Sequence, residues 1–488
     1  MKKIYLENGV EATAASYHDF PLPEFNDNPF IQTLPPLKSK EEIIKTLHKK
    51  PLFSKEEKGY ENHYRLIMLQ RLFDYFQPLP IHVEVWEMIN NLIIEGYLSR
   101  NPFDKDYLSY LNNTGKSIIN RTFDFSNSVQ YQTSSSCGMF IGFSGMGKTT
   151  TVNRVLQSLP QIIVHNEYKG SHFNQIQLVW LKLDAPPTSS LKALCLQFFV
   201  KVDELLGTNN YKLYVSRNSS VDSMLPMISQ LSHNIGLGLL VVDELQNIRS
   251  KGAQQILNFF VNLINSGINV ALIGTPGSYR LLEEELRIAR RFTGSAEINY
   301  ENMPNNEEFS FLLESIWRYQ WIKKETELTK EIIDEFYEQT QGISDLLIKL
   351  FIYTQKAAIE NGSERITVSL IKRVAKERFK SIKPMLEAIK SGNPFKMNKY
   401  EDIMKRQVFE PDVPKTRNYP EKSKGTHNTS SVSTTTDNKS SQANHNNTRE
   451  TTKKVQGDIR NLTTEDLSKS VYDHLLEINL IDQMDDWK

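Results

Sequence analysis

Residues 142–149 constrain the fold of this chain more strongly than any other part of its sequence. They read Gly-Phe-Ser-Gly-Met-Gly-Lys-Thr and fit GxxxxGK[ST], a loop whose backbone N–H groups surround phosphate at the start of a helix. An apolar run at 139–141 precedes the loop and a helical stretch at 150–159 follows it, which is the context that such a loop needs. The pattern predicts a phosphate-binding loop in an α/β domain; the alternative is a glycine-rich turn without a ligand.

The loop also supplies the residues expected to hold a nucleotide. The Lys148 ammonium should reach the β- and γ-phosphates of ATP, and the Thr149 hydroxyl should bind magnesium. The other expected contacts come from the rest of the loop and the first helical turn: Gly142, Phe143, Ser144, Gly145, Met146, Gly147 and Thr150. ATP and magnesium are therefore the expected cofactors.

A second apolar run, 239–242, ends in the acidic pair Asp243 and Glu244. At the carboxyl edge of a parallel sheet this pair should lie beside the phosphate loop. We expect Asp243 to bind the nucleotide through magnesium and Glu244 to polarise the attacking water as general base. An acid pair favours a hydrolase over a kinase, because water activation needs a base of its own. The alternative is an ordinary strand that ends in solvated acids.

Two further features fit the same reaction. Thr275 follows the apolar run 270–274, and its hydroxyl could orient water or the γ-phosphate; the alternative is a simple strand-end cap. Arg287, Arg290 and Arg291 lie on one helical stretch. Arg290 or Arg291 is expected to act on the ATP of a neighbouring subunit and to stabilise transition-state charge. The alternative is arginines that are solvated or paired with acids.

The order of apolar runs and helical stretches predicts the architecture. Runs at 139–141, 177–183, 239–242, 270–273 and 296–300 are separated by helical stretches, which indicates a parallel sheet with helices on both faces. The fold class is therefore an α/β P-loop NTPase with a small helical domain before it and a helical lid and disordered tail after it. The expected divisions are an extended proline-rich arm (1–38), a helical N-terminal domain (39–125), the nucleotide-binding domain (126–303), the lid (304–385), a largely disordered linker (386–465) and a short amphipathic segment (466–488).

Composition limits the partners and the location. Lys+Arg and Asp+Glu are equal at 58 each, so any DNA binding must come from local patches and not from net charge. Cys137 and Cys195 lack the spacing of a metal site and are expected to be reduced packing residues. The sequence shows neither an apolar signal peptide nor a run of about 20 apolar residues. We therefore expect a cytoplasmic protein without a membrane partner.

The order of these motifs resembles that of AAA+ ATPases, and several segments resemble more narrowly the TnsC family, AAA+ regulators of Tns-type DNA transposons. The most specific segments are 243–247 (DELQN), 257–260 (LNFF), 272–276 (LIGTP) and 289–291 (ARR); 96–102 and 341–345 add to them. The resemblance covers about residues 60–380. One departure concerns the lid, where the position that often carries a sensor arginine in AAA+ proteins holds Asp345.

The resemblance implies a protein that assembles with ATP on double-stranded DNA as a ring or filament of identical subunits. It would couple a target-selection protein to transposase subunits, and ATP hydrolysis would control the lifetime of the assembly. Lys148, Thr149, Asp243, Glu244 and Thr275 would take the roles given above. The alternatives are a different AAA+ role, such as a DNA-loading initiator or a defence-system ATPase, and a P-loop protein switch without DNA binding.

DNA contacts are expected in an insertion between the second strand and residue 239. Its two helical stretches, 191–206 and 219–233, are joined by a polar segment and could face a central DNA. The candidate phosphate contacts are Lys192, Lys201, Lys212 and Arg217. The alternative for each of them is a solvated surface cation.

Overall fold

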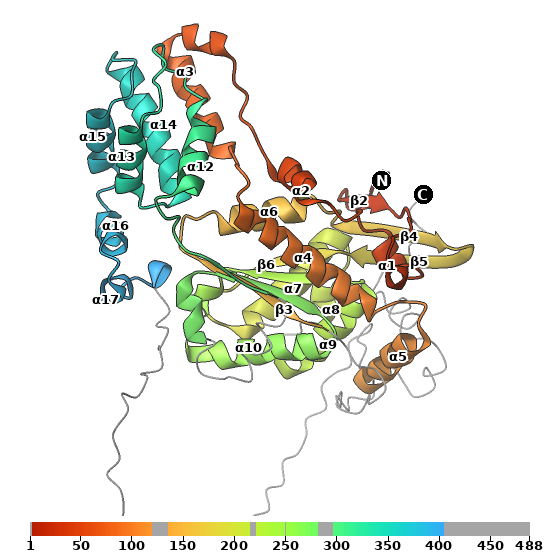
Figure 1. Cartoon of the computed structure of the whole chain (residues 1–488). Coiled ribbons are helices and arrows are strands. Elements are labelled where there is room, and N and C mark those ends of the chain that lie inside the picture. The colour runs from red at the N-terminus through yellow and green to blue at the C-terminus, as the bar shows by residue number, and fades with distance from the viewer. Residues whose placement is uncertain (1, 120–134, 215–220, 249, 282–295, 405–488) are drawn as a thin grey trace, which may run out of the picture.

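A five-stranded parallel sheet forms the centre of the protein in the computed structural model, which describes residues 2–119, 135–214, 221–248, 250–281 and 296–404 (Figure 1). The strands run in the order β6-β7-β8-β3-β9. They are β3 (Cys137–Gly142), β6 (Trp180–Asp184), β7 (Leu239–Asp243), β8 (Asn269–Gly274) and β9 (Ala296–Tyr300). This sheet confirms the predicted α/β fold class.

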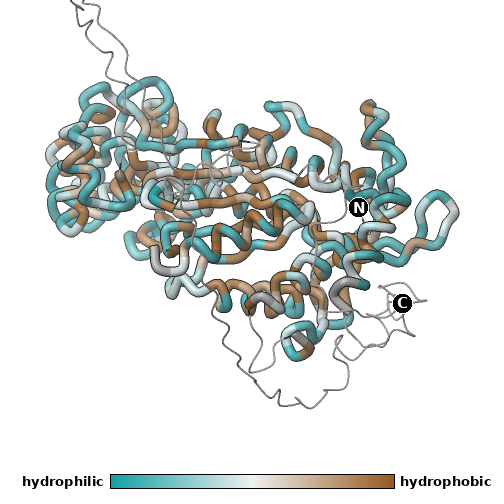
Figure 2. The backbone as a smooth tube through the Cα atoms, turned by 90° about the horizontal axis from the view of Figure 1, so that it is seen from below, coloured by the Kyte–Doolittle hydropathy of each residue, from teal (hydrophilic) through white to brown (hydrophobic). Residues whose placement is uncertain are grey.

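Alternating side chains of the sheet enter two hydrophobic cores. On β3, Phe140 joins one core while Met139 and Ile141 join the other, as the period of two along a strand requires. The first face is covered by α4 (Pro80–Leu98) and α6 (Lys148–Gln157). The second face is covered by α7 (Leu191–Leu206), α9 (Val221–Asn234) and α10 (Ser250–Asn265). Apolar residues accordingly concentrate along the central strands of the tube in Figure 2.

A second, four-stranded sheet lies beside the first, in the order β1-β2-β4-β5. It consists of β1 (Lys3–Tyr5), β2 (Glu11–Ala14), β4 (Ile162–Tyr168) and β5 (Ser171–Leu178). The segment expected to be an extended arm therefore contributes two strands, then η1 (Pro23–Phe25) and α1 (Pro29–Gln32). The run 177–183 is divided between β5 and β6, because the chain passes from one sheet to the other there.

The N-terminal helices do not form a body apart from the sheet. α2 (Lys40–Leu47), η2 (Lys55–Gly59), α3 (Asn62–Met68) and η3 (Leu69–Asp74) lead into α4, which packs on the central sheet. α5 (Lys105–Ile119) packs on α9, and α8 (Asn210–Tyr214) on α7. From α3, the fully buried Arg65 donates two hydrogen bonds, of 2.7 and 2.8 Å, to the carboxylate of Glu364, which follows the lid helix α14 (Ser344–Glu360). The N-terminal region thus joins the sheet to the lid.

The lid consists of four helices: α12 (Glu307–Trp317), α13 (Lys330–Thr340), α14 (Ser344–Glu360) and α15 (Val368–Arg378). Three further elements follow: α16 (Lys383–Lys390), α17 (Pro394–Met397) and η6 (Glu401–Ile403). The last two fall in the segment assigned to a disordered linker, yet Met397 and Ile403 are buried. The expected C-terminal segment 466–488 lies outside the described residues. None of the helices that the structure describes is long and apolar enough to cross a membrane.

Candidate nucleotide site

The loop between β3 and α6 has the backbone geometry that the sequence pattern predicts. Gly147 caps α6 at a φ of 85°, in the left-handed region that favours glycine. At Gly142 a Cβ would lie 2.3 Å from the Tyr300 carbonyl oxygen, because β3 and β9 approach closely there. The Phe143 N–H donates to that same oxygen at 2.9 Å. The loop is therefore fixed against β9 at one end and opens at the start of α6.

Lys148 turns back onto this loop. Its Nζ donates to the carbonyl oxygens of Gly142 at 2.7 Å and Phe143 at 2.9 Å. Burial lowers the pKa of Lys148 to about 8, against the opposing attraction of Asp243, Asp402 and Glu244. The ammonium is thus poorly solvated and lies beside carboxylates, where an anionic phosphate would be a further favourable partner.

Asp243 ends β7 with its side chain buried. One carboxylate oxygen, Oδ1, accepts the Glu244 N–H at 2.8 Å, and the other, Oδ2, forms an ion pair with Lys182 Nζ at 2.9 Å. Lys182 on β6 also donates to Asn153 Oδ1 at 3.1 Å. Sequence analysis did not single out Lys182, because its apolar strand neighbours gave no sign that its side chain reaches the end of the next strand.

Gln246 links Glu244 to Thr275. Its Oε1 accepts the Thr275 N–H at 3.0 Å, and its Nε2 donates to the Glu244 carboxylate. Glu244 itself has a φ of 58°, a left-handed conformation that is uncommon for residues other than glycine. The Thr275 hydroxyl is buried and finds no hydrogen-bond partner within the described part of the chain. Gln246 was quoted in the sequence motif, but its bridging position required the fold.

The strand order brings these groups together. β8 lies between β3 and β7, so Thr275 stands between the phosphate loop and the acid pair. All three strand ends open into one cavity of about 550 Å³. The predicted site residues that line this cavity are Ser144, Gly145, Met146, Gly147, Lys148, Thr149, Thr150, Asp243, Glu244 and Thr275.

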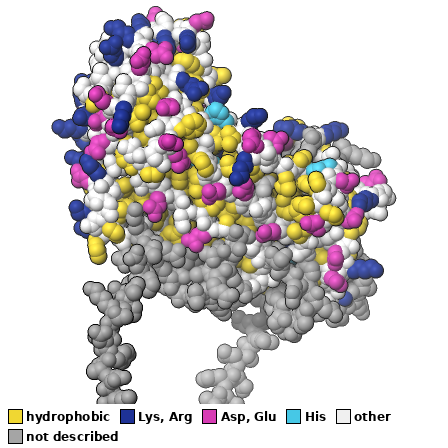
Figure 3. All heavy atoms as spheres, in the orientation of Figure 1, with side chains coloured by type: hydrophobic (Ala, Val, Ile, Leu, Met, Phe, Trp, Pro, Cys, Tyr) yellow, Lys and Arg dark blue, Asp and Glu magenta, His cyan; other side chains and the backbone are white. Residues whose placement is uncertain are grey.

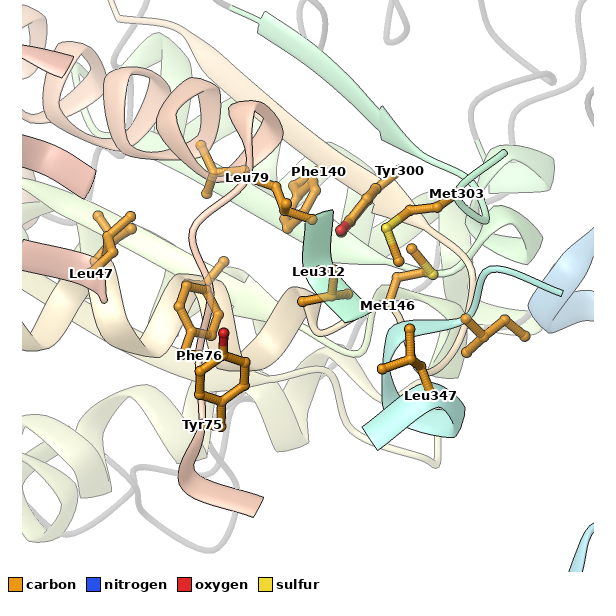
Figure 4. Close-up of a cluster of buried hydrophobic side chains, with 14 of the residues drawn as sticks. Leu47, Tyr75, Phe76, Leu79, Phe140, Met146, Tyr300, Met303, Leu312 and Leu347 are labelled. Carbon is orange, nitrogen blue, oxygen red and sulfur yellow. The ribbon is translucent and has the colours of Figure 1, made fainter. Parts of the chain in front are cut away.

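Another part of the cavity lining, its aromatic end, consists of aromatic and apolar side chains. Tyr75, Phe76, Leu79, Tyr300 and Leu312 surround it, and Figure 4 shows them converging from the N-terminal region, the sheet and the lid. The Tyr300 hydroxyl is buried, and the structure gives it no hydrogen-bond partner among the residues it covers. These residues come from three distant segments, which is why sequence analysis missed them.

His82 also lines this aromatic end. It is held in place as α4 begins, where its Nδ1 accepts the Leu79 N–H at 2.9 Å. Burial lowers the pKa of His82 to about 4, so its ring is neutral near pH 7. A flat apolar base would fit this end of the cavity, while phosphates would fit the end beside Lys148.

The lid contacts the phosphate loop directly. The N–H of Asp345 and the hydroxyl of Ser344, at the start of α14, donate to the Gly145 carbonyl oxygen at 3.0 and 3.2 Å. The Asp345 carboxylate pairs with Lys349 at 2.6 Å. The lid therefore presents an acid and backbone groups to the cavity at the position where the resemblance would place an arginine.

Of the remaining predicted site residues, those that the structure describes are not among the residues that line this cavity. Arg290 and Arg291 lie outside the described residues, and so does Arg217. Lys192 and Lys212 are exposed on α7 and α8, and Lys201 pairs with Glu204 at 2.6 Å. Figure 3 shows Lys and Arg interspersed with Asp and Glu over the face seen there.

A family model for the AAA domain matches residues 131–282. The chain contains an AAA domain. The match includes the phosphate loop, β7 with its acid pair, and β8 with Thr275, and it supports ATP binding and hydrolysis in general terms. No curated protein matches the chain.

Among solved structures, the chain is similar to the ORC1 protein of Aeropyrum pernix in complex with DNA, at 13% identity and a TM-score of 0.35, covering 56% of this chain and 67% of that one. It is also similar to a Walker-type ATPase of Pyrococcus abyssi, at 14% identity and a TM-score of 0.34, covering 60% and 77%. It is similar as well to domain III of the replication initiator DnaA of Thermotoga maritima, at 15% identity and a TM-score of 0.29, covering 56% of this chain and 92% of that one. Scores this low carry no inference about function.

Proposed function

We propose that the chain is an ATPase that binds its nucleotide in the cavity between the AAA domain and the lid. The observation that carries the proposal is the convergence of Lys148, Asp243, Glu244 and Thr275, from the phosphate loop and two strand ends, on that one cavity. The aromatic end would hold the base, and the loop N–H groups would hold the phosphates. Hydrolysis fits better than phosphoryl transfer to a second substrate, because Glu244 is exposed to the cavity as a base for water.

Magnesium fits the same residues. Asp243 is a buried carboxylate whose cationic partner in this structure is Lys182, and Thr149 lines the same cavity. These two side chains would hold the ion, which supplies positive charge to the phosphates when bound. Glu244 would take the proton of the attacking water, and Thr275 would orient that water or the terminal phosphate through its unpartnered hydroxyl.

We further propose that this ATPase regulates DNA transposition as a TnsC-type protein. The sequence resemblance in residues 243–247, 257–260, 272–276 and 289–291 supports the role. Identical subunits would assemble with ATP on double-stranded DNA and connect a target-selection protein to the transposase, and hydrolysis would end the assembly. Lys192, Lys201 and Lys212, together with Arg217, remain the proposed DNA contacts, and Arg290 or Arg291 the proposed trans-acting arginine.

Light scattering after gel filtration tests the proposal, with ATP, ADP or no nucleotide, and with or without duplex DNA. The expected result is a large species that needs both ATP and DNA and that persists in Glu244→Gln, because this variant binds ATP without a base to hydrolyse it. Lys148→Ala is the matched control and should not assemble. A chain that stays monomeric and ignores DNA in every nucleotide state would rule out the transposition role, and normal turnover in Glu244→Gln would rule out Glu244 as the base.

A further inference from the structure

The last described turn of the chain, η6, touches the phosphate loop. The Ser144 N–H donates to the carbonyl oxygen of Asp402 at 3.3 Å, and Asp402 lines the nucleotide cavity. Met397 and Ile403, on either side of this contact in sequence, are 1% and 2% exposed and belong to the core shared by the sheet and the lid. The turn is therefore anchored by buried side chains and does not rest on the surface by one hydrogen bond alone.

The charge of this turn opposes a nucleotide. The Asp402 carboxylate attracts Lys148 and acts to raise its pKa, as a bound phosphate would. The Asp402 carbonyl oxygen occupies an N–H of the loop, the kind of donor that surrounds phosphates in P-loop proteins. The Asp402 carbonyl oxygen thus takes one N–H of the loop, and its carboxylate, which attracts Lys148, would repel phosphate oxygens bound beside that lysine.

The same turn also touches η5 (Pro276–Leu281), the short 3-10 helix that follows Thr275. Arg280 Nη1 forms an ion pair with Glu401 Oε1 at 3.0 Å, and its Nη2 lies 3.6 Å from the Met404 sulfur. At Gly277 an added Cβ would lie 3.1 Å from the Cβ of Glu401, so the two backbones are close. η6 therefore connects the phosphate loop after β3 with the loop after β8, the two loops that flank the proposed phosphate position.

We propose that residues 401–404 are a removable stopper of the phosphate end of the cavity, which must leave before ATP binds fully. The inference rests on the proposed nucleotide site, and it adds that the docking of η6 regulates ATP binding there. Because Ser144 has one N–H to donate and the Asp402 carboxylate repels phosphate, docking of η6 and binding of ATP exclude each other. By linkage, ATP weakens the docking of η6 to the same degree that η6 weakens ATP binding.

A reversible disulfide tests this exclusion in the full chain. The variant Gly277→Cys/Glu401→Cys places two cysteines at a Cβ separation of 3.1 Å, near the range of about 3.5–4.5 Å that disulfides use. The native Cys137 and Cys195 are buried, and burial raises the pKa of Cys195 to about 12, so neither should compete in the oxidation. The readout is binding of a fluorescent ATP analogue with magnesium, before and after reduction.

The oxidised protein should bind ATP at least about tenfold more weakly than the same protein after reduction, and the single-cysteine variants should not respond to oxidant. Equal ATP affinity in the oxidised and reduced forms would overturn the stopper. Absence of ATP binding in the wild type and in the reduced variant would instead overturn the nucleotide site itself, and the stopper with it.

A charge substitution gives a second measurement. Asp402→Asn should tighten ATP binding about fivefold, the effect of removing one like charge a few ångströms away in a water-exposed site. Glu387→Gln on α16 is the matched control, because its carboxylate is exposed and pairs only loosely with Lys383 at 3.6 Å. Unchanged binding in Asp402→Asn would contradict the repulsion, and weaker binding would show that Asp402 supports the nucleotide.

Discussion

Among single residues, Lys148 combines a cation with a buried position, and this makes ATP binding sensitive to pH. Its pKa is lowered to about 8 by burial, so the ammonium that attracts phosphate is present below pH 8 and is lost above it. ATP affinity should therefore fall as pH rises through about 8, and ATP binding above that pH should take up a proton. Calorimetry in two buffers with different ionisation enthalpies measures both effects.

Lys148→Arg is the control for this prediction, since a guanidinium keeps its charge over the whole range. If it binds ATP at all, its affinity should be flat from pH 7 to 9. An affinity of the wild type that does not change between pH 7 and 9.5 would contradict the titration of Lys148.

Gln246 is predicted to position Glu244 without touching the nucleotide. Gln246→Ala should lower kcat by about tenfold or more while the KM for ATP stays within about twofold, because the base loses its orientation and the phosphate contacts remain. Gln246→Glu keeps the length but places two carboxylates together, so it should raise the pKa of the base and shift the acidic limb of the pH–rate profile upward. A loss of ATP affinity equal to the loss of kcat would point to a merely structural role.

At the scale of elements, strands marked by an apolar run in the sequence were predictable. Elements whose position depends on contacts with distant parts of the chain were not. The five runs of the central sheet each lie in or overlap a strand, because buried parallel strands are continuously apolar. The positions of the acid pair and of Thr275 could then be predicted too, because these residues lie at the ends of β7 and β8. Lys182, Tyr300 and Asp402 could not be predicted, since their roles depend on which strand or turn lies next to them. β2 was missed for the same reason, since its partner β4 is far along the chain, and β1 joins the sheet only through β2.

The ion pair between Arg65 on α3 and Glu364, just beyond α14, can be tested directly by its effect on the free energy of unfolding. Arg65 pulls the pKa of the Glu364 carboxylate below its usual range, so this pair stabilises the fold at neutral pH and the stabilisation is lost as pH falls through the lowered pKa of Glu364. Arg65→Met should lower the free energy of unfolding by roughly 3 kcal/mol, because the Glu364 carboxylate, only 12% exposed, loses its cationic partner. Urea denaturation at pH 7 measures the loss.

A double-mutant cycle provides the control. Arg65→Met/Glu364→Gln should be less destabilised than the sum of the single variants, with a coupling of about 1–3 kcal/mol. Additive effects would mean that the two hydrogen bonds between the side chains contribute nothing specific.

At the scale of the whole molecule, the proposed hydrolysis needs more than one chain. Arg290→Ala or Arg291→Ala subunits, mixed with Lys148→Ala subunits, should regain part of the ATPase activity, because some interfaces then join an intact loop to an intact arginine. Lys148→Ala alone is the control and should be inactive, as should the variant of whichever arginine acts in trans. Failure of rescue at every ratio, with co-assembly shown by light scattering, would argue against an arginine acting in trans.

The pairing of β2 with β4 also constrains the order in which contacts can form as the protein folds. Thr13 on β2 pairs with Ile163 on β4, and Arg65 pairs with Glu364, so each of these contacts can form only after the later partner has been synthesised. Shortening the chain by residues 1–14 would not simply remove an appendage: it would leave one edge of β4 unpaired, as a template on which newly made chains could associate.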